Sequence, residues 1–114
     1  MELHKLLEGN KPILLDGGMG TMLQAKGLKP GEPPELAALT NPDWLLDIHR
    51  AYVQAGAQII SASTFGANRE KLARTGRTVA EVVPPTVAIA KQAAGDQALV
   101  ALDLGPIGQL LEPT

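Results

Sequence analysis

Three polar segments of the chain follow apolar runs and carry residue types that could bind a small molecule. The first is DGG at 16–18, the second is STF at 63–65, and the third is the acid Asp103. A carboxylate such as Asp16 could receive a cationic group, while hydroxyls and exposed backbone N–H groups could hold a carboxylate. Phe65 would add an apolar wall, so the three segments together predict a polar binding site.

Each segment also has a purely structural interpretation. The glycines at 17, 18 and 20 could serve only to give the chain positive φ angles, and this alternative stays open. Ser63, Thr64 or Asn68 could cap a helix, which is the favoured account of these residues taken alone. Asp103 could cap N–H groups after a strand, but an acid at the end of a buried strand is costly without a partner. A dinucleotide loop is disfavoured because no glycine follows at position 23.

The apolar runs that precede these segments predict three strands, which start near residues 13, 58 and 98. Helical patterns lie between them, and a repeating βα order implies parallel neighbouring strands. The carboxyl ends of parallel strands meet at one edge, where α/β proteins bind ligands. We therefore expect Asp16, Ser63, Thr64 and Asp103 to share that edge.

Five helices are expected: at 2–8, around 21–25, at 42–56, a short one after the loop that begins TFGAN, and one from Pro84 to about Ala94. Asn41 or Thr40 could cap the third, and Gly56 could end it. The last is expected to begin at Pro84 because proline suits a first helical turn. His49 is expected opposite the apolar face of its helix, and neither it nor His4 has the spacing of a metal site.

Composition narrows the possible functions. The 114 residues are 45% hydrophobic, with a net charge of -2 and a pI near 5.6. This balance gives no electrostatic footprint for nucleic acid or an anionic membrane. The arginines and lysine between 69 and 77 are interpreted as a solvated surface. No cysteine, signal peptide or long apolar run occurs, and we expect a cytoplasmic location.

The ordered motifs resemble one known family. The stretches LLDGGMGTMLQ, LTNPDWLLDIHRAYVQAGAQIISASTFGAN with REKL, and LGPIGQLLEPT are similar to the homocysteine S-methyltransferase domain. That domain forms the N-terminal module of cobalamin-dependent methionine synthases and occurs in betaine–homocysteine methyltransferases. The resemblance implies an α/β fold made of the first three βα units of a (β/α)₈ TIM barrel. Residues 13–114 would form this partial barrel, truncated after the third strand, and 1–12 a separate N-terminal segment.

The resemblance also implies the ligand and the chemistry. Homocysteine would be the small-molecule substrate, and a zinc-bound thiolate would accept a methyl group to give methionine. The residues that match the family's amino-acid pocket are Asp16, Gly17, Gly18, Ser63, Thr64, Phe65 and Asp103. The methyl donor stays open between folate with cobalamin, betaine and S-methylmethionine, and cobalamin or methyltetrahydrofolate would bind other modules.

Two departures from the family pattern shape the expectations. The family's zinc ligands are cysteines of later strands, and this sequence has no cysteine. We therefore assign no catalytic or metal-binding residue, and expect the isolated chain to be an inactive piece of a methyltransferase. Pro84-Pro85 falls where the family continues a helix, which predicts a shortened or kinked element.

Two other functions stay open. One is a non-catalytic assembly unit that associates with itself or with the rest of a barrel. The other is a small-molecule-binding α/β domain unrelated to methyl transfer.

Overall fold

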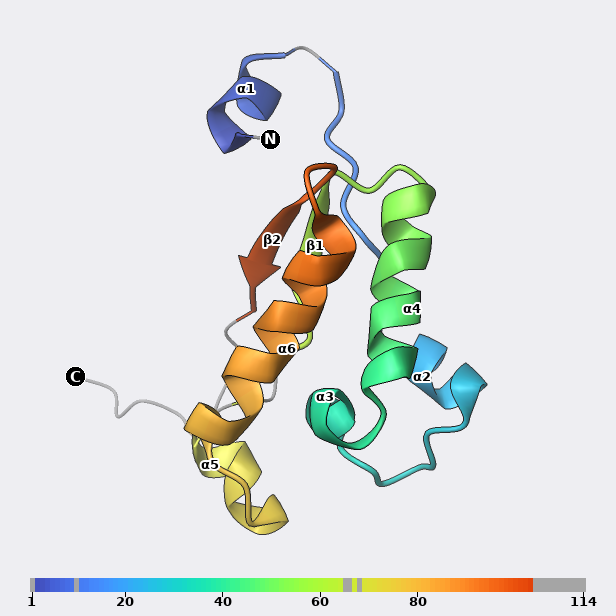
Figure 1. Cartoon of the computed structure of the whole chain (residues 1–114), viewed down its shortest axis with the longest axis vertical. Coiled ribbons are helices and arrows are strands. Elements are labelled where there is room, and N and C mark those ends of the chain that lie inside the picture. The colour runs from blue at the N-terminus through green and yellow to red at the C-terminus, as the bar shows by residue number, and fades with distance from the viewer. Residues whose placement is uncertain (1, 10, 65–66, 68, 104–114) are drawn as a thin grey trace, which may run out of the picture.

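The computed structural model describes residues 2–9, 11–64, 67 and 69–103. These residues form a short parallel sheet covered on one side by helices (Figure 1). The elements, in chain order, are α1 (Leu3–Glu8), α2 (Gly20–Lys26), the 3-10 helix η1 (Pro34–Leu36), α3 (Ala37–Thr40), α4 (Pro42–Gln54), β1 (Ile59–Ala62), α5 (Arg69–Leu72), the 3-10 helix η2 (Ala73–Thr75), α6 (Val79–Ala94) and β2 (Leu99–Leu102). None of the described helices combines the length and the hydrophobicity needed to cross a membrane.

The sheet confirms the expected parallel order for the second and third strands. Within the described residues β1 pairs with β2, with Ile59 opposite Leu99 and Ala62 opposite Leu102. A crossover through α5 and α6 joins the two strands, as parallel pairing requires. The predicted βα order is therefore confirmed for these two strands, while the described residues do not form a closed barrel.

The expected first strand is reduced to a single parallel bridge between Leu15 and Ile59. Side chains accept two of the backbone N–H groups beside that bridge. The N–H of Leu14 donates to Gln58 Oε1 at 3.1 Å, and the N–H of Ser61 donates to Asp16 Oδ2 at 3.0 Å. Backbone bonds also join the two segments, with the N–H of Gln58 donating to the carbonyl of Leu14 at 2.7 Å. Only one bridge forms, however, so the prediction of a regular strand at 13 was wrong.

Helix α4 follows the sequence pattern closely. Pro42 occupies its first turn, and Leu45, Ile48 and Val53 are buried. Gly56 follows the last turn with φ +109°, a conformation that a side chain would strain. Asn41 stands at the N-cap position but makes no side-chain capping bond.

Helix α6 corrects the expected start at Pro84. The helix begins at Val79, because the hydroxyl of Thr78 and the carboxylate of Glu81 form a reciprocal capping box. Pro84 and Pro85 therefore lie inside the helix and remove two backbone donors near its beginning. Small buried residues at four-residue spacing hold the helix against its neighbours, so it is not shortened; they are Val82, Thr86, Ala90 and Ala94.

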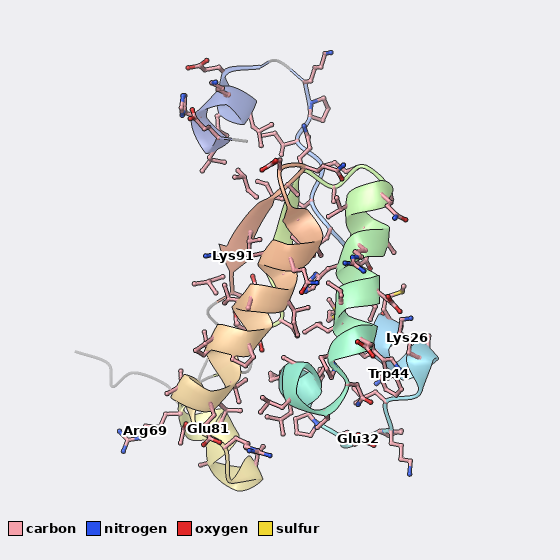
Figure 2. All side chains as sticks on the ribbon, viewed as in Figure 1. Lys26, Glu32, Trp44, Arg69, Glu81 and Lys91 are labelled. Carbon is pink, nitrogen blue, oxygen red and sulfur yellow. The ribbon has the colours of Figure 1, made fainter. Side chains whose placement is uncertain are left out.

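The core consists of two apolar clusters, and α4 contributes to both. One lies between the sheet, α4 and α6, and includes Val53, Ile60 and Ala90. The other lies under α2 and includes Leu23 and Ile48. Charged side chains such as Arg69 and Lys91 point away from the ribbon (Figure 2).

The burial of His49 corrects a third expectation. Its side chain is fully buried, although the helical pattern places it opposite the apolar face. Helix α4 packs against α6 as well as against α2 and α3, so its buried surface is wider than one stripe. Neither ring nitrogen has a hydrogen-bond partner in the described part of the chain, and burial lowers the pKa of His49 to about 4.

Candidate functional site

The polar residues predicted to share a sheet edge do so. Asp16 follows the bridge at Leu15, Ser63 and Thr64 follow β1, and Asp103 follows β2. Because the three segments run parallel, their carboxyl ends lie together. The sequence order alone therefore predicted where these side chains gather.

Asp16 is half-buried and is hydrogen-bonded to β1 through both its backbone and its side chain. Its N–H donates to the carbonyl of Ile59 at 3.1 Å, and its Oδ2 accepts the N–H of Ser61 at 3.0 Å. Burial raises the pKa of the Asp16 carboxyl and the nearby charge of Asp103 raises it further, against the hydrogen bonds from Ser61, which lower it. Two acids in one partly dehydrated edge create a negative potential that favours a cation.

Thr64 connects the ends of β1 and β2. Its hydroxyl donates to the carbonyl of Asp103 at 2.9 Å and accepts the N–H of Asp103 at 3.0 Å. The side chain is buried, with 5% of its surface exposed. Thr64 therefore fixes where Asp103 leaves the sheet, and its hydroxyl proton is already engaged.

The glycine cluster does not serve to give positive φ angles. The described glycines with positive φ are Gly27, Gly31, Gly56, Gly76 and Gly95. Gly17 instead lies against Tyr52, where an added Cβ would come within 3.0 Å of the tyrosine Oη. A Cβ on Gly20 would meet nothing within 4 Å, so the described residues give no steric reason for that glycine. The close contact with Tyr52 therefore explains Gly17, and a positive φ explains none of the three glycines.

The structure describes one of the two predicted site residues that remain. Ser63 is half-buried directly after β1, and Phe65 lies outside the described residues.

The sequence pattern did not predict Tyr52 as part of this site, because Tyr52 was assigned only to the apolar face of its helix. Its hydroxyl donates to the carbonyl of Gly18 at 2.6 Å. The available signal was that a buried tyrosine hydroxyl usually needs a hydrogen-bond partner.

The site does not fit a zinc ion. The sequence contains no cysteine, and the described residues include no group of three or more histidine, aspartate or glutamate side chains that could hold a metal. Asp16 and Asp103 are a pair of oxygen donors, whereas zinc sites are built from three or four ligands rich in nitrogen and sulfur. The described residues therefore supply a polar pocket edge rather than a metal centre.

The described residues thus form an α/β protein with acidic side chains at the carboxyl edge of a parallel sheet. The family model for homocysteine S-methyltransferase matches residues 13–114. The chain therefore belongs to the homocysteine S-methyltransferase family, as the sequence motifs indicated.

Curated relatives and solved structures agree with this family. Betaine–homocysteine S-methyltransferase 1 from Xenopus laevis is 32% identical over 82 residues, which cover 71% of this chain and 20% of the relative. The Bos taurus protein is 32% identical over 78 residues, or 68% of this chain and 19% of the relative. The chain thus spans about a fifth of these proteins.

Among solved structures, the metallated form of the homocysteine methyltransferase MmuM from Escherichia coli superimposes with a TM-score of 0.79 at 28% identity. The match covers 93% of this chain and 42% of the solved chain. The arrangement of helices and strands described above is therefore a part of the fold of that enzyme.

Proposed function

We propose that this chain provides the amino-acid-binding part of a homocysteine S-methyltransferase, in which the substrate sulfur accepts a methyl group to give methionine. The observation that carries the proposal is the placement of Asp16, beside Asp103 and directly before two bare glycines, at the carboxyl edge of the sheet. The family and the neighbouring solved structures are both named as homocysteine methyltransferases, which supports the same ligand here.

The proposed roles follow from donors and charges. Asp16 uses one carboxylate oxygen for Ser61 and keeps the other for the substrate ammonium group. The N–H groups of Gly17, Gly18 and Met19 donate no hydrogen bond to another described residue, so they suit the substrate carboxylate.

The second and third segments would complete the pocket. Thr64 holds Asp103 in place through two hydrogen bonds, and Asp103 adds negative charge near the ammonium group. Ser63 would contribute a hydroxyl and Phe65 an apolar wall. Activation of the substrate sulfur by zinc, which the family resemblance implies, is assigned to no described residue because their donor set does not fit the ion.

Binding of L-homocysteine to the chain, measured by isothermal titration calorimetry, tests these roles. We expect the wild type to bind and Asp16→Asn to bind about ten- to a hundredfold more weakly, because a charge-assisted hydrogen bond is lost. Asp96→Asn is the matched control: it removes the same charge from an exposed residue in the turn between α6 and β2, at the opposite end of the strand. An unmeasurable wild-type affinity, or equal affinities of the two variants, contradicts the proposal.

A second proposal, assembly, is supported by exposed apolar side chains at both edges of the sheet. Leu14 and Leu15 are 54% and 60% exposed on one edge, and Leu102 is 58% exposed on the other. Unpaired strand edges and apolar side chains favour association with more protein. We expect light scattering to give a mass above the 11.9 kDa of one chain. A monomer that unfolds cooperatively would contradict assembly.

A further inference from the structure

Tyr52 reaches from α4 to the glycine loop, 34 residues away in the sequence. Its hydroxyl donates to the carbonyl of Gly18 at 2.6 Å, a short bond for two neutral groups. The ring is partly buried and packs against both apolar clusters of the core. The position of the hydroxyl is therefore set by the core of the molecule and not by the loop that it contacts.

Gly17 fits against the same ring. A Cβ added to it would lie 3.0 Å from Oη, 3.1 Å from Cε1 and 3.3 Å from Cζ of Tyr52. These separations are shorter than ordinary van der Waals contact, so any side chain at this position would displace the ring or the loop. The loop thus meets Tyr52 through a close steric contact at Gly17 and a hydrogen bond at Gly18.

The hydrogen bond also determines where the loop points its donors. None of the described peptide bonds is cis, and in a planar trans peptide the N–H points opposite to the carbonyl. Because the Gly18 carbonyl points at Tyr52, the N–H of Met19 points away from it. Asp16, two residues before Gly18, is anchored independently to β1.

We propose that Tyr52 is a positioning residue, which orients the peptide between Gly18 and Met19 so that the loop can hold the carboxylate of an amino-acid ligand. The proposal rests on the function proposed above and deepens it: Asp16 would recognise the ammonium group without help from Tyr52. The hydroxyl should therefore matter for ligands with a carboxylate and not for the matching amine.

The variant Tyr52→Phe tests this separation, since it keeps the ring and removes only the hydroxyl. We expect L-homocysteine to bind about fivefold more weakly, the effect of one hydrogen bond, while 3-aminopropane-1-thiol, which lacks the carboxylate, binds as to the wild type. The matched control is Thr40→Val, which removes another hydroxyl-to-carbonyl bond, to Leu36 at 3.2 Å, and should change neither affinity. An equal loss for both ligands in Tyr52→Phe, or no loss for either, overturns the proposal.

A measurement without ligand separates failure of this proposal from failure of the proposed function. Amide chemical shifts and hydrogen exchange of Gly18 and Met19 should change in Tyr52→Phe and not in Thr40→Val. If they change while the wild type binds no homocysteine, the proposed function fails and the positioning of the loop by Tyr52 stands. If the loop amides are unchanged, Tyr52 does not position the loop, whatever the wild type binds.

Discussion

Asp16 and His49 are both titratable side chains that burial shifts toward the neutral form, but their surroundings differ. Asp16 lies at the carboxyl edge of the sheet, with Ser61 as a hydrogen-bond partner and Asp103 nearby. His49 lies within the helix layer, fully buried, with no partner for either nitrogen among the described residues. Burial raises the pKa of the acid and lowers the pKa of the histidine to about 4.

This difference distinguishes a polar group that can bind a ligand from one that only destabilises the folded state. Asp16 is only partly buried at the edge of the sheet, so a bound cation could offset the cost of burying its charge. His49 has no opening to a ligand, and its unsatisfied nitrogens cost free energy in the folded state. Charge at the edge should therefore affect binding, whereas charge in the helix layer should affect stability.

The largest effect is expected at His49 on acidification. Its folded-state pKa of about 4 lies below the ordinary value of 6.5, so protons bind the unfolded chain first as the pH falls. The stability contributed by the neutral ring is complete above pH 6.5 and is lost as the pH falls toward 4. The free energy of unfolding should drop by on the order of 3 kcal/mol over that window, which urea unfolding at a series of pH values would measure.

The variant His49→Leu provides the control for that acid transition. Leucine has a similar size and no titrating group, so stability should no longer depend on this site between pH 4 and 6.5. It also removes the unsatisfied nitrogens, which should raise stability at pH 7 by about 1–3 kcal/mol. A variant that retains the full acid dependence would show that other groups cause it, and the contrast with Asp16 would lose its basis.

Much of the fold could be predicted because local signals and burial agreed. The helix at 42–54 has proline at its start, glycine after its end and a regular apolar face. The parallel order of β1 and β2 followed from the βα alternation. The same alternation predicted that Asp16, Thr64 and Asp103 would meet at one edge, since the carboxyl ends of parallel strands coincide.

The remaining features depend on competition that a local pattern does not reveal. The start of α6 was missed because Pro84-Pro85 outweighed the signature of Thr78 and Glu81, a capping box that was present in the sequence. The expected first strand is a single bridge, beside which the side chains of Gln58 and Asp16 accept backbone N–H groups.

The burial of His49 and the reach of Tyr52 to Gly18 depend on which helices pack against α4. Only the tertiary structure shows these contacts.

The smallest effect on stability is expected for Asp16→Asn, although its effect on binding is large. Since the folded-state pKa of Asp16 is raised above its ordinary 3.8, its protonated form is favoured by folding. That contribution is present below pH 3.8 and is lost as the pH rises through the raised pKa, so ionised Asp16 slightly destabilises the protein at neutral pH. Asparagine keeps an oxygen that can accept the N–H of Ser61 and carries no charge to bury.

The free energy of unfolding of this variant at pH 7 should therefore match or slightly exceed that of the wild type, and the difference should shrink as the pH falls through the raised pKa of Asp16 toward 3.8. Homocysteine affinity of the wild type should fall over the acidic range in which Asp16 gains its proton, because the neutral acid no longer attracts an ammonium group. A clear loss of stability in Asp16→Asn at pH 7 would mean that the acid, like the hydroxyl of Thr64, serves the fold first. The edge and the helix layer would then differ in exposure but not in function.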